Sequence, residues 1–465
     1  AGVTVKYKLG AWHSGGGPEV FANNYGCADG TCDNPSAPAT VFEYTVTGSG
    51  GLPWPGKGWP YADHAVGYPP VALWKEEGVV GNNYMNVQLD QNGTLYDVYY
   101  PSAGCVQGMG TKNEGYVDGL DTFPPGLPAG YRGQMNANQA MAGLRVDGVT
   151  YWLSNENASG YSNVAQAYVT DTNVIATTAT QTTGGHSIVV QQYDFCPKGI
   201  AYPTDLGGNP NRGLYLKRFL LTNSGASEET VQFYYYADFA LNGGDAYDAM
   251  FADAARGALI AYDNTYRTTS SSGEYNPTTI GDYAKDVSIY LAAALKLLDS
   301  PGAGGGTPAT GSWRQNGATD NGQGWIGLEV ALPVGVTKEI DLAIVGGFDD
   351  FAGATGTYDY QIAPVLDWFL AGNMSTIQAA TETYWQDWLA AGVVIDTPDN
   401  RLDAAYKRGL LATALHLDGK NGGVVAGMHN GAYPFVWPRD AVWAAVTLDR
   451  RSEEHTSELQ SHHPI

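Results

Sequence analysis

Short runs of apolar residues, separated by turn residues, recur along the chain from about residue 80 to residue 350. Runs of this length and spacing predict β-strands, and many such strands in succession predict a sandwich of two antiparallel sheets. A turn at residues 223–226 further predicts that the strands on either side of it form a hairpin. The predicted strands are Met85–Leu89, Leu95–Tyr99, Val149–Leu153, Val164–Val169, Ile188–Tyr193, Leu214–Leu221, Val231–Leu241, Val287–Leu295, Ile326–Leu332 and Glu339–Val345.

The hydrophobic period changes from that of strands to that of helices after residue 350. Apolar residues recur at helical spacing over Thr376–Ala391 and again over Arg401–Leu417. Asp399 or Asn400 is expected to cap the start of the second of these helices, and Gly419 its end. A third helix is expected to begin near Asp440.

Strands followed by helices indicate two domains. Residues 1–375 are expected to form an N-terminal β-sandwich domain, in which residues 1–80 are a loop-rich extension. Residues 376–400 form a linker helix, and residues 401–450 begin a helical domain. The last fifteen residues, 451–465, have neither the hydrophobic period of a strand nor that of a helix. They look like a translated sequencing adapter, so they are predicted to be an artefact of sequence assembly.

The charge of the chain narrows the class of ligand. Only 15% of the residues are charged and the formal net charge is −23. Nucleic acid or an anionic membrane as a partner would require clustered Lys and Arg, so a neutral ligand such as a sugar fits better. Adaptation to high salt is an alternative explanation of the acidity. No apolar run approaches the ~18 residues that predict a membrane-spanning helix.

Four cysteines indicate an oxidising compartment. Cys27 and Cys32 lie in one short loop, and Cys105 and Cys196 are candidates for a second disulfide. Free buried thiols are the alternative. The chain begins at Ala1, and we expect a secreted protein from which a leader has been removed.

The segment from Tyr433 to Asp440, Tyr-Pro-Phe-Val-Trp-Pro-Arg-Asp, carries the candidate binding residues. Tyr433 and Trp437 offer flat apolar faces to a sugar ring, Arg439 offers a planar set of donors, and Asp440 can accept from two hydroxyls. The alternative roles are structural: Asp440 as a helix cap, Arg439 in a surface ion pair and Trp437 in the core.

Three separated segments resemble family 15 glycoside hydrolases, the glucoamylases and glucodextranases. The stretch from Leu402 to Arg450, with the helix Ala404–Leu411, the Gly-rich turn and the Trp-Pro-Arg-Asp sequence, resembles the start of their catalytic domain. Gly93–Pro101 is similar to a strand of the bacterial members' N-terminal sandwich, and Thr383–Leu389 to their linker helix. The resemblance implies a large antiparallel β-sandwich followed by the first helices of an (α/α)6 barrel.

The resemblance also implies an activity, the release of glucose from non-reducing ends of α-glucans with inversion, without a cofactor. Tyr433, Trp437, Arg439 and Asp440 are then substrate-binding residues. Inversion requires two carboxyl groups roughly 6.5–9.5 Å apart. In the family both are glutamates of later barrel loops, and no Glu occurs here between Glu382 and Glu453, so both are expected beyond residue 450.

Two other functions remain open. One is a non-catalytic, carbohydrate-binding β-sandwich protein, and the other is a related enzyme that acts on trehalose or dextran. Some relatives bind calcium, but no Asp cluster here has the spacing of a calcium loop, so no metal site is predicted.

Overall fold

The computed structural model describes residues 3–7, 10–11, 20–21, 42–46, 78–100, 103, 139–153, 160–239, 241, 248–263, 287–315, 322–350, 358–419, 422–427 and 436–451. The chain divides into two compact units, Ala1–Pro60 and Tyr61–Ile465. The boundary predicted near residue 375 falls inside the second unit.

The first unit contains short strands in the region predicted to be loop-rich. β1 (Val3–Tyr7) pairs with β4 (Phe42–Val46), and β2 (Gly10–Ala11) pairs with β3 (Val20–Phe21), both antiparallel.

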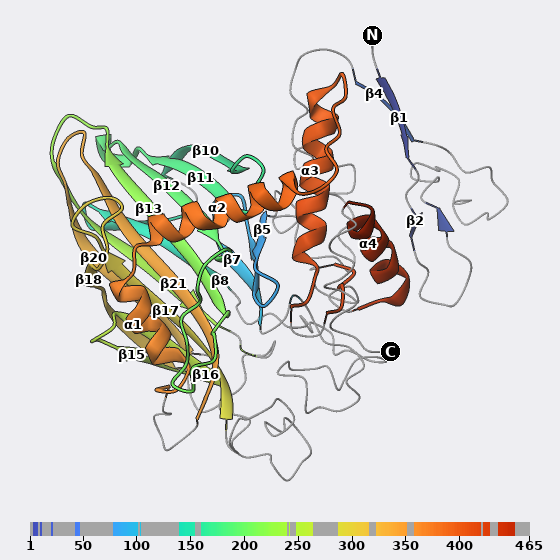
Figure 1. The fold of residues 1–465 in the computed structure, drawn as a ribbon. Helices are drawn as coiled ribbons and strands as arrows, with labels where there is room; N and C mark the ends of the chain where they lie inside the picture. Colours follow the sequence, from blue (N-terminus) through green and yellow to red (C-terminus); the bar gives the residue numbers. More distant parts are fainter. Residues whose placement is uncertain are drawn as a thin grey trace. The chain divides into compact units, whose positions relative to one another are not determined.

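The second unit contains the predicted sandwich of two antiparallel sheets (Figure 1). The nine-stranded sheet has the order β10 (Tyr161–Tyr168), β11 (Ile175–Gln181), β12 (Ile188–Phe195), β13 (Leu214–Asn223), β21 (Thr337–Asp350), β17 (Val287–Leu297), β16 (Ala258–Asp263), β15 (Asp248–Asp253), with β18 (Thr307–Pro308) beside β17. The eight-stranded sheet has the order β19 (Thr310–Gln315), β20 (Gly322–Leu332), β14 (Glu229–Asp238), β8 (Gln139–Val146), β7 (Leu95–Tyr99), β6 (Asn86–Leu89), β5 (Gly78–Gly81), with β9 (Val149–Trp152) beside β8.

The predicted hairpin of β13 and β14 is wrong. Both strands exist, but β13 pairs with β12 and β21, whereas β14 pairs with β8 and β20 in the other sheet. The connection therefore crosses between the sheets, so that Phe219 of β13 meets Phe233 of β14 across the core with ring centroids 4.7 Å apart. Asn223 holds this connection, because its Nδ2 donates to the carbonyls of Ser227 and Leu332 at 2.7 and 2.8 Å.

Among the described residues, four helices follow the strands: α1 (Ile362–Ala371), α2 (Met374–Ala390), α3 (Asn400–Leu415) and α4 (Pro438–Arg451). α1 was not expected from the sequence. The side chain of Asp399 accepts from Arg401 N, as predicted for the start of α3. The predicted end at Gly419 is wrong, because α3 stops at Leu415 and His416 is its C-cap. None of the described helices is long and apolar enough to cross a membrane.

α1 and α2 lie across the outer face of the nine-stranded sheet (Figure 1). The strand β17 explains this layer, because it is apolar on both faces. Leu291, Ala293 and Leu295 point into the sandwich, whereas Tyr290, Ala292 and Ala294 belong to a second core that includes Ile362, Val365, Leu366 and Phe369 of α1.

A buried lysine fixes the end of α1 on this sheet. Lys296 Nζ donates to the carbonyls of Phe369 and Gly372 at 2.8 and 2.7 Å, which satisfies groups left open at a helix C-terminus. Beside it, Arg218 Nε donates to Glu339 Oε1 at 2.6 Å, and Arg218 Nη1 donates to Gln378 of α2 at 2.6 Å. These charged contacts attach both helices to the sandwich.

Candidate functional site

Three of the four predicted sugar-binding residues lie together where α4 begins. Pro438 is the first helical residue, a position where its missing N–H costs no hydrogen bond. The carbonyl of Trp437 accepts from Ala441 N at 2.8 Å, and Arg439 and Asp440 follow in the first turn. Tyr433 lies outside the described residues.

Arg439 and Asp440 are accessible to a ligand. Their side chains are 51% and 37% exposed, and Arg439 Nη2 lies 3.6 Å from Asp440 Oδ1. An exposed pair at this distance contributes little to stability. The carboxylate of Asp440 is also favoured electrostatically at a helix N-terminus. Trp437 is half-buried beside them.

The Gly-rich turn that follows α3 contacts the segment before α4. Within this turn, Asp418 N donates to Gly423 O and Gly422 N donates to Asp418 O, both at 2.8 Å. A Cβ on Gly423 would lie 2.7 Å from Val436 Cγ2, so glycine allows the close approach of the two segments. The structure thus places the turn next to the residue that precedes Trp437.

Polar contacts that the sequence did not reveal hold α3 on the sandwich. Asn83, in the turn between β5 and β6, has φ of 74° and donates from Nδ2 to the carbonyls of Ala414 and Leu417 at 2.7 and 2.8 Å. Farther from the C-terminus of the helix, Lys407 Nζ lies 2.6 Å from Asp171 Oδ2, and Arg408 Nη1 donates to Thr172 O at 2.8 Å. The helix that precedes the candidate site therefore has a fixed place on the sandwich.

Lys198 joins the sandwich to α2 and contacts Asn83, the residue that bonds to the end of α3. Its Nζ donates to Asn83 Oδ1 at 2.5 Å and lies 5.3 Å from the ring centroid of Tyr384 on α2. Burial and, to a smaller extent, the nearby positive charge of Arg212 together lower the pKa of Lys198 to about 8.

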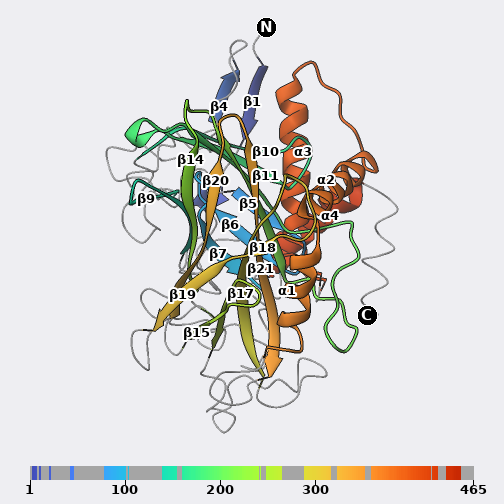
Figure 2. The same cartoon turned by 90° about the vertical axis from the view of Figure 1, so that its left-hand side faces the viewer.

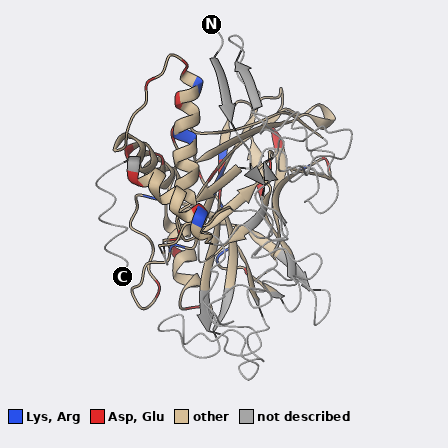
Figure 3. Ribbon diagram, turned by 90° about the vertical axis from the view of Figure 1, so that its right-hand side faces the viewer, with Lys and Arg blue, Asp and Glu red and all other residues tan. Residues whose placement is uncertain are grey.

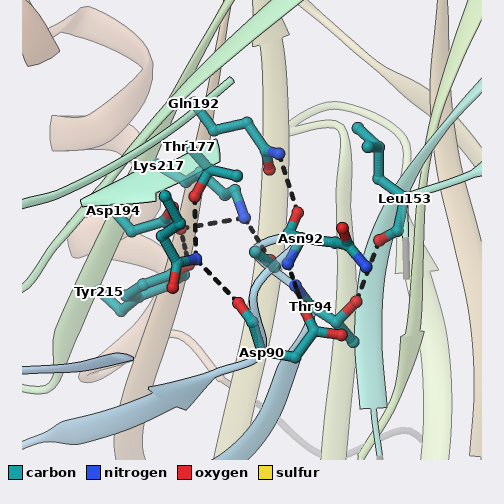
Figure 4. Close-up of polar contacts among 11 residues, drawn as sticks. Asp90, Asn92, Thr94, Leu153, Thr177, Gln192, Asp194, Tyr215 and Lys217 are labelled. Carbon is teal, nitrogen blue, oxygen red and sulfur yellow. Dashed lines mark hydrogen bonds and ion pairs between the residues drawn. The ribbon is translucent and has the colours of Figure 1, made fainter. Parts of the chain in front are cut away.

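A second group of polar residues lies inside the sandwich, between the two sheets (Figure 4). Side chains of the nine-stranded sheet donate to three carbonyls of the turn between β6 and β7. Gln166 Nε2 donates to Asp90 O at 2.8 Å, Gln192 Nε2 to Asn92 O at 3.0 Å, and Lys217 Nζ to Gly93 O at 2.6 Å. The network therefore satisfies a turn that is buried in the core.

The centre of this network is a buried ion pair between neighbouring strands. Lys217 Nζ lies 2.9 Å from Asp194 Oδ1, and both side chains have no exposed surface. Burial raises the pKa of Asp194, an effect that the Lys217 charge and the Tyr215 hydroxyl donor partly offset. Because solvent does not reach these groups, we interpret the network as structural.

The cysteine predictions receive one correction. Cys196 is a free thiol, buried in the sandwich core, and is not one half of a disulfide. Cys27, Cys32 and Cys105 lie outside the described residues. Among the residues that the structure describes, no group of three His, Cys, Asp or Glu side chains is arranged to hold a metal ion.

Comparisons with known proteins give distant structural matches. No family model matches the chain, and no curated protein matches it significantly by sequence. A bacterial glucoamylase solved with acarbose is 12% identical, with a TM-score of 0.44, over 82% of this chain and 49% of that one. A protein named as a kojibiose phosphorylase from the human microbiome is 8% identical, with a TM-score of 0.43, over 75% of this chain and 40% of that one. A family 92 glycosyl hydrolase is 10% identical, with a TM-score of 0.36, over 76% of this chain and 40% of that one.

The present chain thus spans 49% of the glucoamylase and 40% of the kojibiose phosphorylase protein. The structure itself is a mostly antiparallel β-sandwich followed by helices.

Proposed function

We propose that this chain is the N-terminal part of a secreted glycoside hydrolase of the glucoamylase type. The whole protein would release glucose from the non-reducing ends of α-glucans with inversion. Tyr433, Trp437, Arg439 and Asp440 would bind the terminal glucose, and other residues would supply the acid and the base.

The observation that carries the proposal is the position of Arg439 and Asp440. Both lie in the first turn of a helix, next to a Gly-rich turn, with 51% and 37% of their side-chain surface exposed. This is the arrangement expected from the sequence resemblance, in which the pair binds sugar hydroxyls. The order of a β-sandwich followed by helices supports the proposal.

The chemistry of the pair suits a hexose. Arg439 has only donors and Asp440 has only acceptors, whereas each sugar hydroxyl both donates and accepts. Two neighbouring hydroxyls can therefore accept from the guanidinium and donate to the carboxylate together. The half-buried indole of Trp437 lies at the start of the same turn.

Titration calorimetry with maltotriose, isomaltotriose and trehalose tests the proposal. We expect maltotriose to bind, and Asp440→Asn to weaken its binding by roughly 10- to 100-fold, the size expected for hydrogen bonds to a charged group. Asp449→Asn, near the other end of α4, is the matched control and should bind as the wild type does. Unchanged affinity in Asp440→Asn, or no binding of any of the three sugars by the wild type, would contradict the proposal.

A further inference from the structure

Large aromatic side chains gather on the outer face of the eight-stranded sheet, the face turned away from the core. We name Trp152 of β9, Tyr234 and Tyr236 of β14, and Trp325 of β20 the aromatic face. Along β14, Phe233 and Tyr235 point into the core and are fully buried, whereas Tyr234 and Tyr236 alternate with them and are half-buried. Figure 2 shows β14 and β20 side by side in this sheet.

The rings of the aromatic face contact one another across strands. The ring centroids of Tyr234 and Trp325 lie 5.2 Å apart, and those of Trp152 and Tyr236 lie 6.0 Å apart. Tyr236 is directly opposite Trp325 in the pairing of β14 with β20. Trp325 is 39% exposed, so a residue with a large apolar ring is open to solvent at this place.

Two glycines let these rings lie close against the sheet. Gly143 is opposite Trp152, and a Cβ there would lie 2.6 Å from Trp152 Cε3. Gly327 is opposite Tyr234, and a Cβ there would lie 2.8 Å from Tyr234 Cδ1. Because no side chain separates them from the backbone, the rings of Trp152 and Tyr234 lie close against the sheet, and the ring of Trp325 stands nearly perpendicular to that of Tyr234, at 85°.

A polar row runs beside the aromatic face. Gln232 of β14 is directly opposite Arg145 of β8 and Glu329 of β20. The hydroxyl of Tyr234 donates to Gln232 Oε1 at 3.0 Å, which joins the row to the rings. Arg145 and Glu329 are exposed and have opposite charges, so the row has no net charge.

The residue composition of this surface indicates which class of ligand it can bind. A polyanion would require several cations, and a row with one cation and one anion does not supply them. A sugar chain presents flat C–H faces, which pack on aromatic rings, and hydroxyls, which can bond to guanidinium, amide and carboxylate groups. Neighbouring strands are about 4.8 Å apart, so the aromatic face is wide enough for more than one sugar ring.

We propose that the aromatic face binds a chain of α-glucan at a site formed by the sandwich alone. The identity of the sugar rests on the proposed function, but the site does not include α4. Such a site would bind polymeric substrate on the side of the sandwich opposite α1 and α2. The alternative role of these residues is to stabilise the sheet through cross-strand pairs.

Affinity electrophoresis in gels that contain soluble starch tests the inference on the full chain. We expect the wild type to be retarded, and Trp325→Ala to bind starch about fivefold more weakly or worse, as loss of one ring contact implies. Trp325→Phe should retain most of the affinity. Tyr360→Ala, which removes an aromatic ring of similar exposure (41%) beside α1, should behave as the wild type does.

Two further measurements separate the possible outcomes. Thermal unfolding of Trp325→Ala shows whether the sheet is intact; weaker starch binding by a folded variant supports the site, whereas equal affinity of Trp325→Ala and wild type overturns it. Maltotriose binding, measured in parallel, should be unchanged in Trp325→Ala and reduced in Asp440→Asn. If starch retardation depends on Asp440 alone, the aromatic face is not a binding site although the proposed function stands. If maltotriose fails to bind while starch retardation depends on Trp325, the aromatic face is a binding site and the proposed function is wrong.

Discussion

The carbonyl of Gly93 accepts a hydrogen bond from Lys217 in the opposite sheet, and this contact depends on the absence of a side chain. Gly93 has φ of 80°, and a Cβ on it would lie 2.9 Å from Gln192 Oε1 and 3.1 Å from Lys217 Nζ. Glycine adopts this backbone conformation without the strain that other residues incur. The first residue of the sequence Gly93–Pro101 therefore has a structural reason to be glycine.

Replacement of Lys217 by methionine is expected to destabilise the fold strongly. The change leaves Asp194 buried without its cation and leaves Gly93 O without its donor. Removal of one partner from a buried ion pair costs about 3–5 kcal/mol. Urea unfolding of Lys217→Met measures this loss. Lys407→Met is the control, because its ion pair with Asp171 is partly exposed and contributes at most about 1 kcal/mol. Equal losses of unfolding free energy in the two variants would show that burial of the ion pair does not determine the size of the loss.

At the scale of elements, the turn between β5 and β6 determines where α3 ends. Asn83 donates to the carbonyl of Ala414 in the last turn of α3 and to that of Leu417 just beyond the helix, and it accepts a hydrogen bond from Lys198. The buried face of α3, with Leu410, Leu411 and Leu415, packs with Tyr99 of β7 and Trp385 of α2. Sandwich, linker helix and α3 thus share one apolar cluster.

Two substitutions of Asn83 separate its hydrogen bonds to the end of α3 from its left-handed backbone conformation. Asn83→Gly removes the cap but tolerates φ of 74°, whereas Asn83→Ala also adds about 1–2 kcal/mol of left-handed backbone strain. Both variants should exchange the amide hydrogens of the last turn of α3 faster, and Asn83→Ala should be the less stable of the two in urea. Asn163→Ala is the control, because Asn163 has φ of 54° on exposed β10. Faster exchange of α3 in Asn163→Ala would rule out a specific effect of the cap.

The sequence predicted many of the elements because their hydrophobic period is local information. β12 alternates between buried and half-buried positions along most of its length, and α2 and α3 keep their apolar stripes. β11 alternates in the same way but was not predicted, because its sequence, Ile-Ala-Thr-Thr-Ala-Thr-Gln, contains only one large apolar residue. The pairing of β13 with β21 instead of β14 depends on contacts across the core, which a local turn signal does not contain. α1 was missed because its apolar residues form a short run, which gives no periodic signal by itself.

At the scale of the whole molecule, charge is concentrated where parts of the fold meet. Figure 3 shows few charged residues along the strands, and Lys and Arg along α3. Lys296 and Arg218 attach α1 and α2 to the nine-stranded sheet, and Arg408 attaches α3 to the turn after β10. These contacts join residues distant in sequence, so the sequence predicted the Arg439–Asp440 pair from a motif but not the polar contacts that position α3 before it.

The junction of sandwich, α2 and α3 is expected to respond to pH through Lys198. Its pKa is lowered to about 8 in the folded chain, against about 10.4 for an unperturbed lysine. Below pH 8 both states are protonated, and folding carries the cost of burying a charge. Between pH 8 and about 10.4 the unfolded chain binds more protons than the folded chain, so the free energy of unfolding rises with pH. Lys198→Met lacks this contribution.

Urea unfolding of wild type and Lys198→Met at pH 7 and pH 10 measures this contribution, since other titrating groups are common to both proteins. The free energy of unfolding of the wild type should gain on the order of 2 kcal/mol relative to Lys198→Met over this interval, at about 1.4 kcal/mol for each pKa unit. Hydrogen exchange of α3 should slow over the same interval in the wild type alone, because Lys198 bonds to the residue that caps this helix. A constant difference between the two proteins from pH 7 to pH 10 would mean that Lys198 is not forced to bury its charge, and that the junction is held by the cap and the shared apolar cluster alone.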